Sequence, residues 1–416
     1  MTKPSVAIIG AGAAGMMCAG TLYKLGITPT VFETMQRPGR KVGITGKGRC
    51  NLTNNCTPED FIQNIPTNPR FMYGAINSFS PQDMIELTEF LGVPVKTERG
   101  NRVFPVSDKA RDMVDALCKY MHVKPITDTR ITDVTYQSGK FKLTSNDKNY
   151  FFDIVVIATG GASYSATGSR GDGYKFAEKS GHTIVDLKPS LIPLETKGRT
   201  ARDMMGVSLK NVAIKVRDKQ NGKILYEDFG EMMFTHFGIT GPVVLSASSH
   251  IREYDGRQYS FEIDLKPALD EEKLDKRLLS DFEKNSNKDL ANAMGLLLPK
   301  GMIMPFIRQC GLDPHKKLNV ITKAERKTIL QHLKCFCLDI SGPRPIEEAI
   351  VTSGGVSTKE LSPKTMESKL VPNLYFAGEI IDVDGYTGGF NLQIAYSTGV
   401  CAARAIYNKI NTTEDL

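Results

Sequence analysis

A short apolar run followed by three spaced glycines constrains this chain more than any other feature. Residues 6–9 read Val-Ala-Ile-Ile, which is typical of a parallel strand buried on both faces. Gly10, Gly12 and Gly15 follow at the GxGxxG spacing. In such a turn the first glycine permits a tight bend, the second lets the backbone approach a pyrophosphate, and the third packs a helix against the strand. The sequence therefore predicts a dinucleotide-binding turn in which the N-terminus of a helix faces the phosphates.

The residues after this turn strengthen the prediction. Residues 16–25 have the composition of a helix that ends at Gly26, and residues 28–32 form a second strand-like run that ends at Glu33. An acidic residue at this position can accept hydrogen bonds from a ribose hydroxyl pair, and it disfavours a 2′-phosphate. The alternative is an ordinary βαβ unit whose glycines serve packing alone. The combination of features favours nucleotide binding.

Composition limits the classes of protein to consider. The 416 residues are enough for two or three domains, and the formal net charge is +7. Lys and Arg are scattered, aromatic residues make up 8% and Trp is absent, so we expect no nucleic-acid partner. The eight Cys form no CxxC pair and no zinc spacing, so no metal site is predicted. Because we find no leader and no long apolar run, we expect a soluble, cytoplasmic protein that does not enter a membrane.

Residues 37–54 mix cations with glycines and read as a loop, because they are too irregular for a helix and too rich in glycine for a strand. Glycines expose backbone N–H groups to an anion. The cations of this segment could neutralise a diphosphate or a reduced flavin anion, and they are Arg40, Lys41, Lys47 and Arg49. The alternative is a solvated basic loop or a nucleic-acid patch.

This segment carries a family resemblance. Residues 39–41 (Gly-Arg-Lys), 45–51 (Thr-Gly-Lys-Gly-Arg-Cys-Asn) and 53–54 (Thr-Asn) follow the glycine turn. In that order they resemble the NAD(P)/FAD-dependent oxidoreductase family that includes aminoacetone oxidase and a bile-acid enone reductase. The family usually has a larger aliphatic residue where this chain has Gly43. The resemblance implies that the protein binds FAD through both the glycine turn and this segment.

Later motifs fit the same cofactor. Residues 153–161 form an apolar strand ending in Ala-Thr-Gly-Gly, which resembles the short ATG motif of FAD-dependent folds. Residues 352–356 (Thr-Ser-Gly-Gly-Val) resemble another family motif, and residues 373–385 have the form of the late FAD motif, in which a carboxylate accepts from the ribityl chain. Residues 388–391 precede a last helix, 392–406, whose N-terminus would face the flavin pyrimidine edge. The residues expected to contact the cofactor are Gly10, Gly12, Ala14, Gly15, Glu33, Arg40, Lys41, Gly46, Gly48, Arg49, Cys50, Asn51, Ala158, Thr159, Gly160, Gly378, Glu379, Asp382, Gly388, Gly389, Phe390 and Asn391.

The order of these motifs predicts an α/β fold in two parts. Residues 1–190 and 341–416 should form a Rossmann-like FAD-binding domain with a glutathione-reductase-like layout. Residues 191–340 should form an inserted domain, with a β-barrel over 191–265 and helices over 266–333. We expect the substrate where the inserted domain meets the FAD domain. Other expected elements are a helix over 82–91 capped by Ser80, a hairpin over 131–145, a strand over 151–158, and a hairpin over 207–234 that turns at Asn221-Gly222.

A flavin would carry the chemistry, and hydride would pass between its N5 atom and a small-molecule substrate. The side chain of Arg49, the backbone of Gly388 and Gly389 and the dipole of the last helix are candidates for stabilising the reduced flavin anion. His236 lies in a glycine-rich loop after a strand and is a candidate catalytic residue. The alternative is that His236 only bonds to a backbone partner.

Three functions remain open at this point. The first is an oxidase of a small amine such as aminoacetone, in which oxygen reoxidises the flavin. The second is a reductase of an activated C=C bond, in which NAD(P)H is a dissociable co-substrate. We find no second nucleotide-binding motif, which favours oxygen. The third is a flavin-binding sensor or scaffold without catalysis. The sequence specifies neither the substrate nor the oligomeric state.

Overall fold

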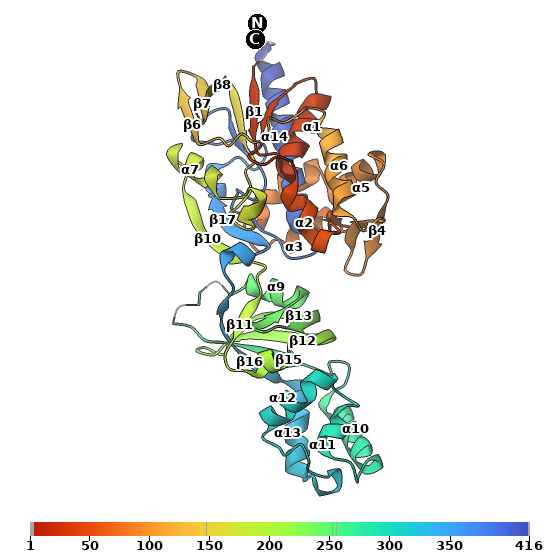
Figure 1. Cartoon of the computed structure of the whole chain (residues 1–416). Helices are drawn as coiled ribbons and strands as arrows, with labels where there is room; N and C mark the ends of the chain where they lie inside the picture. The colour runs from red at the N-terminus through yellow and green to blue at the C-terminus, as the bar shows by residue number, and fades with distance from the viewer. Residues whose placement is uncertain (1–3, 147, 252, 255, 415–416) are drawn as a thin grey trace. The chain divides into compact units, whose positions relative to one another are not determined.

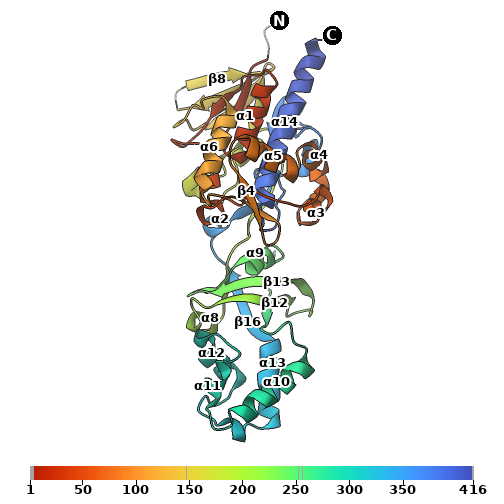
Figure 2. The same cartoon turned by 90° about the vertical axis from the view of Figure 1, so that its right-hand side faces the viewer.

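A computed structural model describes residues 4–146, 148–251, 253–254 and 256–414. The chain divides into two compact units (Figures 1 and 2), each with its own hydrophobic core. Unit 1 comprises residues 1–190 and 346–416, and unit 2 comprises Leu191–Pro345. The chain therefore leaves unit 1, builds unit 2 and returns to complete unit 1.

The central sheet of unit 1 is parallel and buried. Its four strands lie in the order β18 (Leu374–Phe376), β9 (Ile154–Ile157), β1 (Val6–Ile9) and β2 (Thr30–Phe32). Ile8 pairs with Val31 on one side and with Val156 on the other. All four residues of β1 are buried, which confirms the predicted strand. This arrangement brings the ends of β1, β2, β9 and β18 to one edge of the sheet.

Two helices, one near each end of the chain, lie side by side at this sheet. Helix α1 (Ala13–Lys24) follows the glycine turn, and α14 (Phe390–Glu414) lies beside it in both views (Figures 1 and 2). A Cβ atom at Gly399 of α14 would lie 2.4 Å from the carbonyl oxygen of Ala14, so the two helix backbones are in contact. The N-terminal and C-terminal motifs are therefore part of one structure.

The rest of unit 1 surrounds this core. Its helices are α2 (Arg40–Gly48), α3 (Pro58–Gln63), α4 (Tyr73–Ser78), α5 (Pro81–Phe90), α6 (Ala110–Met121) and α7 (Asp172–Lys179). Its antiparallel sheets are β3 (Thr53–Asn54), β5 (Arg102–Pro105) and β4 (Val95–Glu98); β6 (Asp133–Gln137), β7 (Lys140–Ser145) and β8 (Lys148–Phe152); and β10 (Ile184–Ser190) with β17 (Val351–Val356). The hydroxyl of Ser80 and the carboxylate of Asp83 cap α5 reciprocally, which confirms the predicted helix start.

Unit 2 contains a closed antiparallel barrel and a group of helices. The barrel strands are β11 (Leu194–Thr196), β14 (Gly238–Thr240), β13 (Ile224–Phe234), β12 (Ser208–Asp218), β15 (Tyr259–Asp264) and β16 (Phe336–Pro343). The helices are α8 (Thr200–Asp203), α9 (Pro242–Ser248), α10 (Glu271–Lys284), α11 (Leu290–Met294), α12 (Lys300–Cys310) and α13 (Lys323–Lys334). Helix α10 buries Leu274, Leu278 and Phe282, which are four residues apart and share one face.

The structure corrects four expectations. The barrel range 191–265 omits β16, which follows the helices and closes the barrel by pairing with β15 and β11. The strand predicted over 151–158 is two strands, because the Asp153 carboxylate between them accepts hydrogen bonds from Ser5 N and Oγ at 2.8 and 2.7 Å. The last helix begins at Phe390 and runs past 406. The segment 37–54 is not all loop, because α2 lies within it and is broken only at residues 45–47.

Candidate cofactor site

The glycine turn has the geometry of a nucleotide cradle. Gly10 has a φ of +104°, and a Cβ atom there would lie 2.5 Å from the carbonyl oxygen of Ala158. A Cβ atom at Gly15 would lie 1.9 Å from the carbonyl oxygen of Gly10. The packing of the chain itself therefore requires both glycines. A Cβ atom at Gly12 would meet nothing within 4 Å, so Gly12 faces open space, as a close approach of pyrophosphate requires.

Glu33 places its carboxylate beside this turn. Its Oε2 atom accepts a hydrogen bond from Ala11 N, and its Oε1 atom accepts one from Met35 N, both at 2.8 Å. Burial raises the pKa of Glu33, while these backbone N–H groups act in the opposite direction. Each oxygen retains a lone pair that could accept from a ribose hydroxyl. The position of Glu33 is thus compatible with its predicted role.

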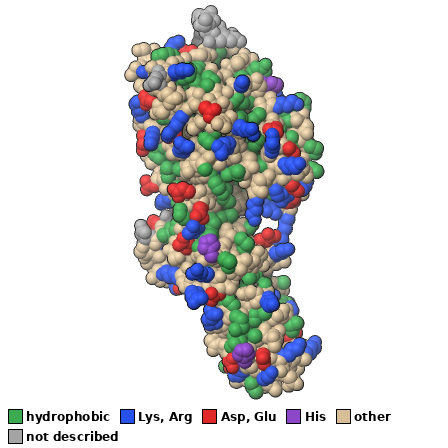
Figure 3. Space-filling view, in the orientation of Figure 1, with side chains coloured by type: hydrophobic (Ala, Val, Ile, Leu, Met, Phe, Trp, Pro, Cys, Tyr) green, Lys and Arg blue, Asp and Glu red, His purple; other side chains and the backbone are tan. Residues whose placement is uncertain are grey.

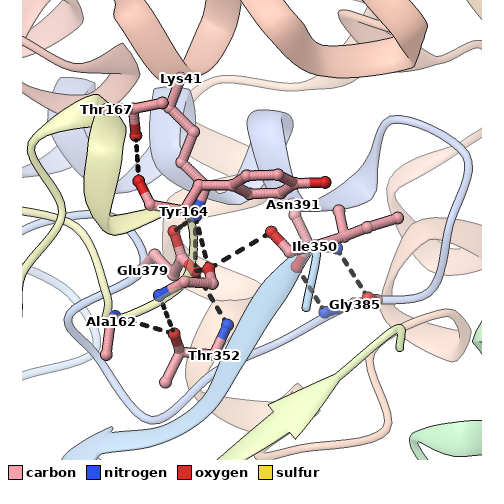
Figure 4. Close-up of polar contacts among 10 residues, drawn as sticks. Lys41, Ala162, Tyr164, Thr167, Ile350, Thr352, Glu379, Gly385 and Asn391 are labelled. Atoms are coloured by element: carbon pink, nitrogen blue, oxygen red, sulfur yellow. Dashed lines mark hydrogen bonds and ion pairs between the residues drawn. The ribbon is translucent and has the colours of Figure 1, made fainter. Parts of the chain in front are cut away.

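A polar cluster joins four of the sequence motifs (Figure 4). Lys41 Nζ donates to Glu379 Oε2 at 2.7 Å and to Ser163 Oγ at 2.8 Å. Glu379 Oε1 also accepts from Thr352 N at 2.9 Å, and Thr352 Oγ1 accepts from Ala162 N at 2.9 Å. The side chains of Lys41 and Glu379 are 23% and 18% exposed. This ion pair is therefore shielded from bulk water and still accessible to a ligand.

The turn before α14 is fixed by β3. Asn54 Nδ2 donates to the carbonyl oxygen of Gly388 at 3.0 Å. A Cβ atom at Gly389 would lie 2.3 Å from the carbonyl oxygen of Thr53, so only glycine fits there. The side chain of Asn391 exchanges two hydrogen bonds with the backbone of Gly385, at 2.9 and 2.7 Å. These contacts hold the N-terminus of α14, where the partial positive charge of the helix lies, at a fixed position.

Buried side-chain polar atoms without a hydrogen-bond partner occur in both units of the described part of the chain. In unit 1 they include Asn51 Oδ1, Thr159 Oγ1 and the hydroxyl of Tyr174. An unpaired buried polar atom costs about 1–3 kcal/mol, so a bound group that pairs with these three atoms would be favoured. Burial raises the pKa of Tyr174, and the carboxylates of Glu379 and Asp382 raise it further, so its hydroxyl remains a donor. The residues present therefore fit a dinucleotide cofactor.

Other predicted contacts are already engaged within the chain. The guanidinium of Arg49 pairs with Glu98 and with Asp108, the latter at 2.6 Å, and lies 4.2 Å from the ring centroid of Phe104. Asp382 is buried and its Oδ2 atom accepts from Asn68 Nδ2 at 2.8 Å. The stabilisation of a flavin anion by Arg49 therefore stays a prediction. Burial raises the pKa of the Cys50 thiol to about 12, which makes it a packing residue.

His236 differs from the other candidates because it belongs to unit 2. It is exposed in the loop after β13, and its ring centroid lies 5.0 Å from that of Phe237. Its catalytic role also stays a prediction. Sequence reasoning did not assign Ser163, Thr352 or Tyr174 to the site. Thr352 belongs to a recognised motif, but only its hydrogen bonds show that it contacts the Glu379 cluster.

Comparison with known proteins agrees with this geometry. Residues 4–405 match the family described as HI0933-like protein Rossmann domain. The chain belongs to this family. With the cradle described above, it is an FAD-dependent oxidoreductase with a Rossmann-type FAD-binding domain.

Relatives of this chain have two different names. Two are called ribosomal RNA dihydrouridine synthase: one from Escherichia coli is 30% identical, covering 97% of this chain and 98% of the relative, and one from Haemophilus influenzae is 31% identical, covering 96% and 97%. A third, from Clostridium scindens, is called 3-dehydro-bile acid delta(4,6)-reductase and is 29% identical, covering 96% and 98%. The solved 3-ketosteroid-delta4-(5alpha)-dehydrogenase of Rhodococcus jostii has a TM-score of 0.51 at 13% identity, covering 97% and 96%, which shows likeness of fold.

Two kinds of feature are absent from the described residues. None of their helices combines the length and apolar character needed to cross a bilayer. No three His, Cys, Asp or Glu side chains among them are grouped as ligands for a metal ion.

Proposed function

We propose that this protein uses FAD to reduce a C=C bond conjugated to a carbonyl group, and that its substrate is a uracil base in RNA. The observation that carries the proposal is that two relatives, 30% and 31% identical over nearly their full lengths, are named ribosomal RNA dihydrouridine synthase. Formation of dihydrouridine saturates the C5=C6 bond of uracil, which is conjugated to the C4 carbonyl.

The third relative supports the same reaction class. A 3-dehydro bile acid has a ketone at C3, and double bonds at C4 and C6 are conjugated with it. Relatives with unlike substrates thus have names that share one reaction, the reduction of a conjugated C=C bond. This shared chemistry favours the reductase among the functions left open by the sequence, and none of these three names describes an amine oxidase.

The charge of the chain is compatible with RNA. Residues 191–345 contain 25 Lys and Arg against 20 Asp and Glu, so most of the net charge of +7 belongs to unit 2. Lys and Arg spread over the visible face among acidic side chains instead of forming one patch (Figure 3). Scattered cations attract a polyanion less strongly than a basic stripe does, but they still favour its approach. The proposal therefore replaces the expectation of no nucleic-acid partner.

The chain contributes binding and positioning to this reaction. FAD, when bound and reduced, supplies the hydride. Gly12 leaves room for the pyrophosphate, Glu33 can accept from a ribose, and the N-terminus of α14 favours negative charge beside Gly388. A proton must reach the carbon next to the carbonyl, and we propose that His236 is its donor. We also propose NAD(P)H as the dissociable reductant.

A second candidate substrate is a steroid-type enone. The observation that favours it is the Clostridium scindens relative, whose identity of 29% is close to that of the two others. The chemistry at the reacting bond is the same for both candidates, so the two proposals differ in the substrate alone.

One anaerobic experiment tests these proposals together. The purified protein is mixed with NADH or NADPH while the flavin absorbance is followed, and the reduced protein is then offered unmodified rRNA transcribed in vitro, a 3-oxo-Δ4 steroid or buffer. The proposal expects reduction by a nicotinamide and reoxidation by RNA with formation of dihydrouridine. Reoxidation by the steroid alone would favour the second candidate. In a separate arm the oxidised protein is mixed with aminoacetone, and oxygen is admitted afterwards. Bleaching of the flavin by aminoacetone that oxygen reverses would contradict both candidates, and a flavin that no donor reduces would indicate a sensor or scaffold.

A further inference from the structure

A polar pocket lies in unit 1, lined by none of the predicted cofactor contacts. Its volume is about 410 Å³, and the side chains that matter here are Asn55, Thr57, Asp60, Ser80, Gln82 and Asn101. The lining includes neither Lys, Arg nor an aromatic ring. Asp60 supplies one carboxylate, so the lining suits a ligand that offers several hydrogen-bond donors.

Two consecutive residues, Asn54 and Asn55, connect the pocket to the candidate cofactor site. Asn55 N donates to the carbonyl oxygen of Asn101 at 2.7 Å, which joins two sides of the pocket. The preceding residue, Asn54, donates through Nδ2 to the carbonyl oxygens of Gly100 and Gly388, both at 3.0 Å. Asn54 thus connects a residue of the pocket lining, Asn55, to the turn before α14, where we expect the flavin.

The amide groups in the pocket are available for recognition. The hydroxyls of Thr57 and Ser80 are used to cap α3 and α5. Gln82 Nε2 donates to Glu86 at 3.0 Å, so Gln82 Oε1 remains an acceptor. Within the described ranges, the side chain of Asn101 has no hydrogen-bond partner. Asn55 bonds only weakly through its amide, to Thr97 Oγ1 at 3.4 Å.

Two arginines lie close in sequence to Asn101 of the pocket lining. Arg99 and Arg102 flank Asn101 at the turn of the β4–β5 hairpin, which lies at the edge of unit 1 (Figure 1). Arg102 Nε donates to the carbonyl oxygen of Arg99 at 2.9 Å. In the part of the chain that the structure describes, neither arginine has a carboxylate within ion-pair distance, whereas Lys96 on the same hairpin pairs with Asp108 at 2.8 Å. The guanidinium of Arg102 also lies 6.0 Å from the ring centroid of Phe104. Because no carboxylate neutralises either guanidinium, both retain N–H donors for an anion.

We propose that the pocket and the Arg99–Arg102 turn form a nucleotide subsite, which holds a nucleotide adjacent to the reacting uridine of an RNA strand. The proposal rests on the RNA substrate proposed above. The amides and the Asp60 carboxylate would bind the base edge and the ribose hydroxyls, and the arginines would bind the phosphate. The hydrogen-bonding side chains of the pocket match the base edge and ribose of a nucleotide, and the two arginines close to Asn101 in sequence match its phosphate.

The test measures binding of a fluorescently labelled, uridine-containing single-stranded RNA by anisotropy. Two double variants are compared with wild type: Arg99→Gln with Arg102→Gln, and Asn55→Ala with Gln82→Ala. The matched controls are Arg111→Gln, an exposed arginine on α6, and Gln137→Ala, an exposed glutamine on β6. The arginine variant should weaken binding about tenfold and lower its salt dependence. The amide variant should weaken binding about fivefold with an unchanged salt dependence.

Both double variants should keep the FAD content and the rate of flavin reduction by NAD(P)H. If wild type binds the RNA and both double variants bind it as the controls do, the subsite is overturned while the proposed function stands. If wild type does not bind the RNA, the proposed function fails and the subsite fails with it. Equal affinity for UMP and for the RNA would identify a site for a free nucleotide and would overturn the assignment to RNA.

Discussion

Lys41 and Glu379 are 338 residues apart in the sequence, and Lys41 Nζ lies 2.7 Å from Glu379 Oε2. The pair joins the basic segment after the first βαβ unit to the late motif that follows β18. Ser163 and Thr352 add hydrogen bonds to the same carboxylate from two further segments. The cofactor cradle is thus assembled by contacts between motifs that each look incomplete in the sequence.

Lys41→Met should weaken FAD binding about tenfold. Without the ammonium group, the partly buried Glu379 carboxylate loses its ion-pair partner beside a site for an anionic cofactor. Titration of the apoprotein with FAD, followed by flavin fluorescence, measures the dissociation constant. Lys175→Met is the control, because Lys175 is exposed on α7. An unchanged dissociation constant in Lys41→Met would show that this pair does not support the cofactor.

Gly12→Val and Gly15→Ala should fail in different ways. A Cβ atom at Gly12 meets nothing within 4 Å, so Gly12→Val should fold and yield colourless protein because its side chain occupies the place of the pyrophosphate. A Cβ atom at Gly15 would lie 1.9 Å from the Gly10 carbonyl oxygen, so Gly15→Ala should lose stability. Visible absorbance and thermal unfolding by circular dichroism separate the two effects. Full FAD content in Gly12→Val would refute the role of this turn.

Asp108→Asn should remove a part of the stability that depends on pH. Hydrogen bonds from Lys96 and Arg49 hold the pKa of Asp108 below its ordinary value of 3.8. A carboxyl whose pKa is lowered by folding stabilises the protein above its unfolded-state pKa, and this contribution is lost as the pH falls through the folded-state value. Urea unfolding should therefore show the largest difference between wild type and Asp108→Asn near neutral pH and a smaller one below about pH 4. Asp115→Asn, at an exposed site on α6, is the control. A difference that is constant with pH would contradict this assignment.

His236→Gln should slow reduction of the substrate about 100-fold and leave flavin reduction by NAD(P)H unchanged. A proton donor to the substrate acts in the second half-reaction alone, so stopped-flow measurement of each half-reaction separates donation from structural damage. His315→Gln is the control, because the side chain of His315 is 81% exposed in unit 2. Equal slowing of both half-reactions would assign His236 a structural role.

Local patterns predicted much of this structure. The strand at Val6–Ile9, the cap at Ser80 and the hairpin turn at Asn221-Gly222 all depend on residues close in sequence, and all three are present. The pairing of β16 with the barrel was missed because about 70 residues separate β16 from β15, and no local pattern shows which strands pair. Helix α2 was read as a loop because glycines interrupt it, while tertiary contacts such as the bond from Gly39 N to the Ala11 carbonyl oxygen fix its start.

The candidate site likewise has a part that the sequence predicts and a part that it does not predict. The glycine turn, Glu33 and the late motif could be identified from spacing, because each is a short run of defined residues. The bonds of Ser163 and Thr352 to Glu379 could not, because they join segments 216 and 27 residues apart through single side chains. The ion pairs of Arg49 with Glu98 and Asp108 likewise could not be predicted from a basic, glycine-rich stretch.

Formation of dihydrouridine tests the central claim most directly. Wild-type protein and the Gly12→Val variant are each incubated with NAD(P)H and unmodified rRNA transcript without oxygen. The RNA is then digested to nucleosides, and their masses are measured by mass spectrometry after separation. The account predicts dihydrouridine, a uridine heavier by two hydrogen atoms, with wild-type protein, and none with the FAD-free variant. Reduced wild-type flavin that persists beside fully unmodified uridine, while a 3-oxo-Δ4 steroid reoxidises it, would contradict the RNA assignment.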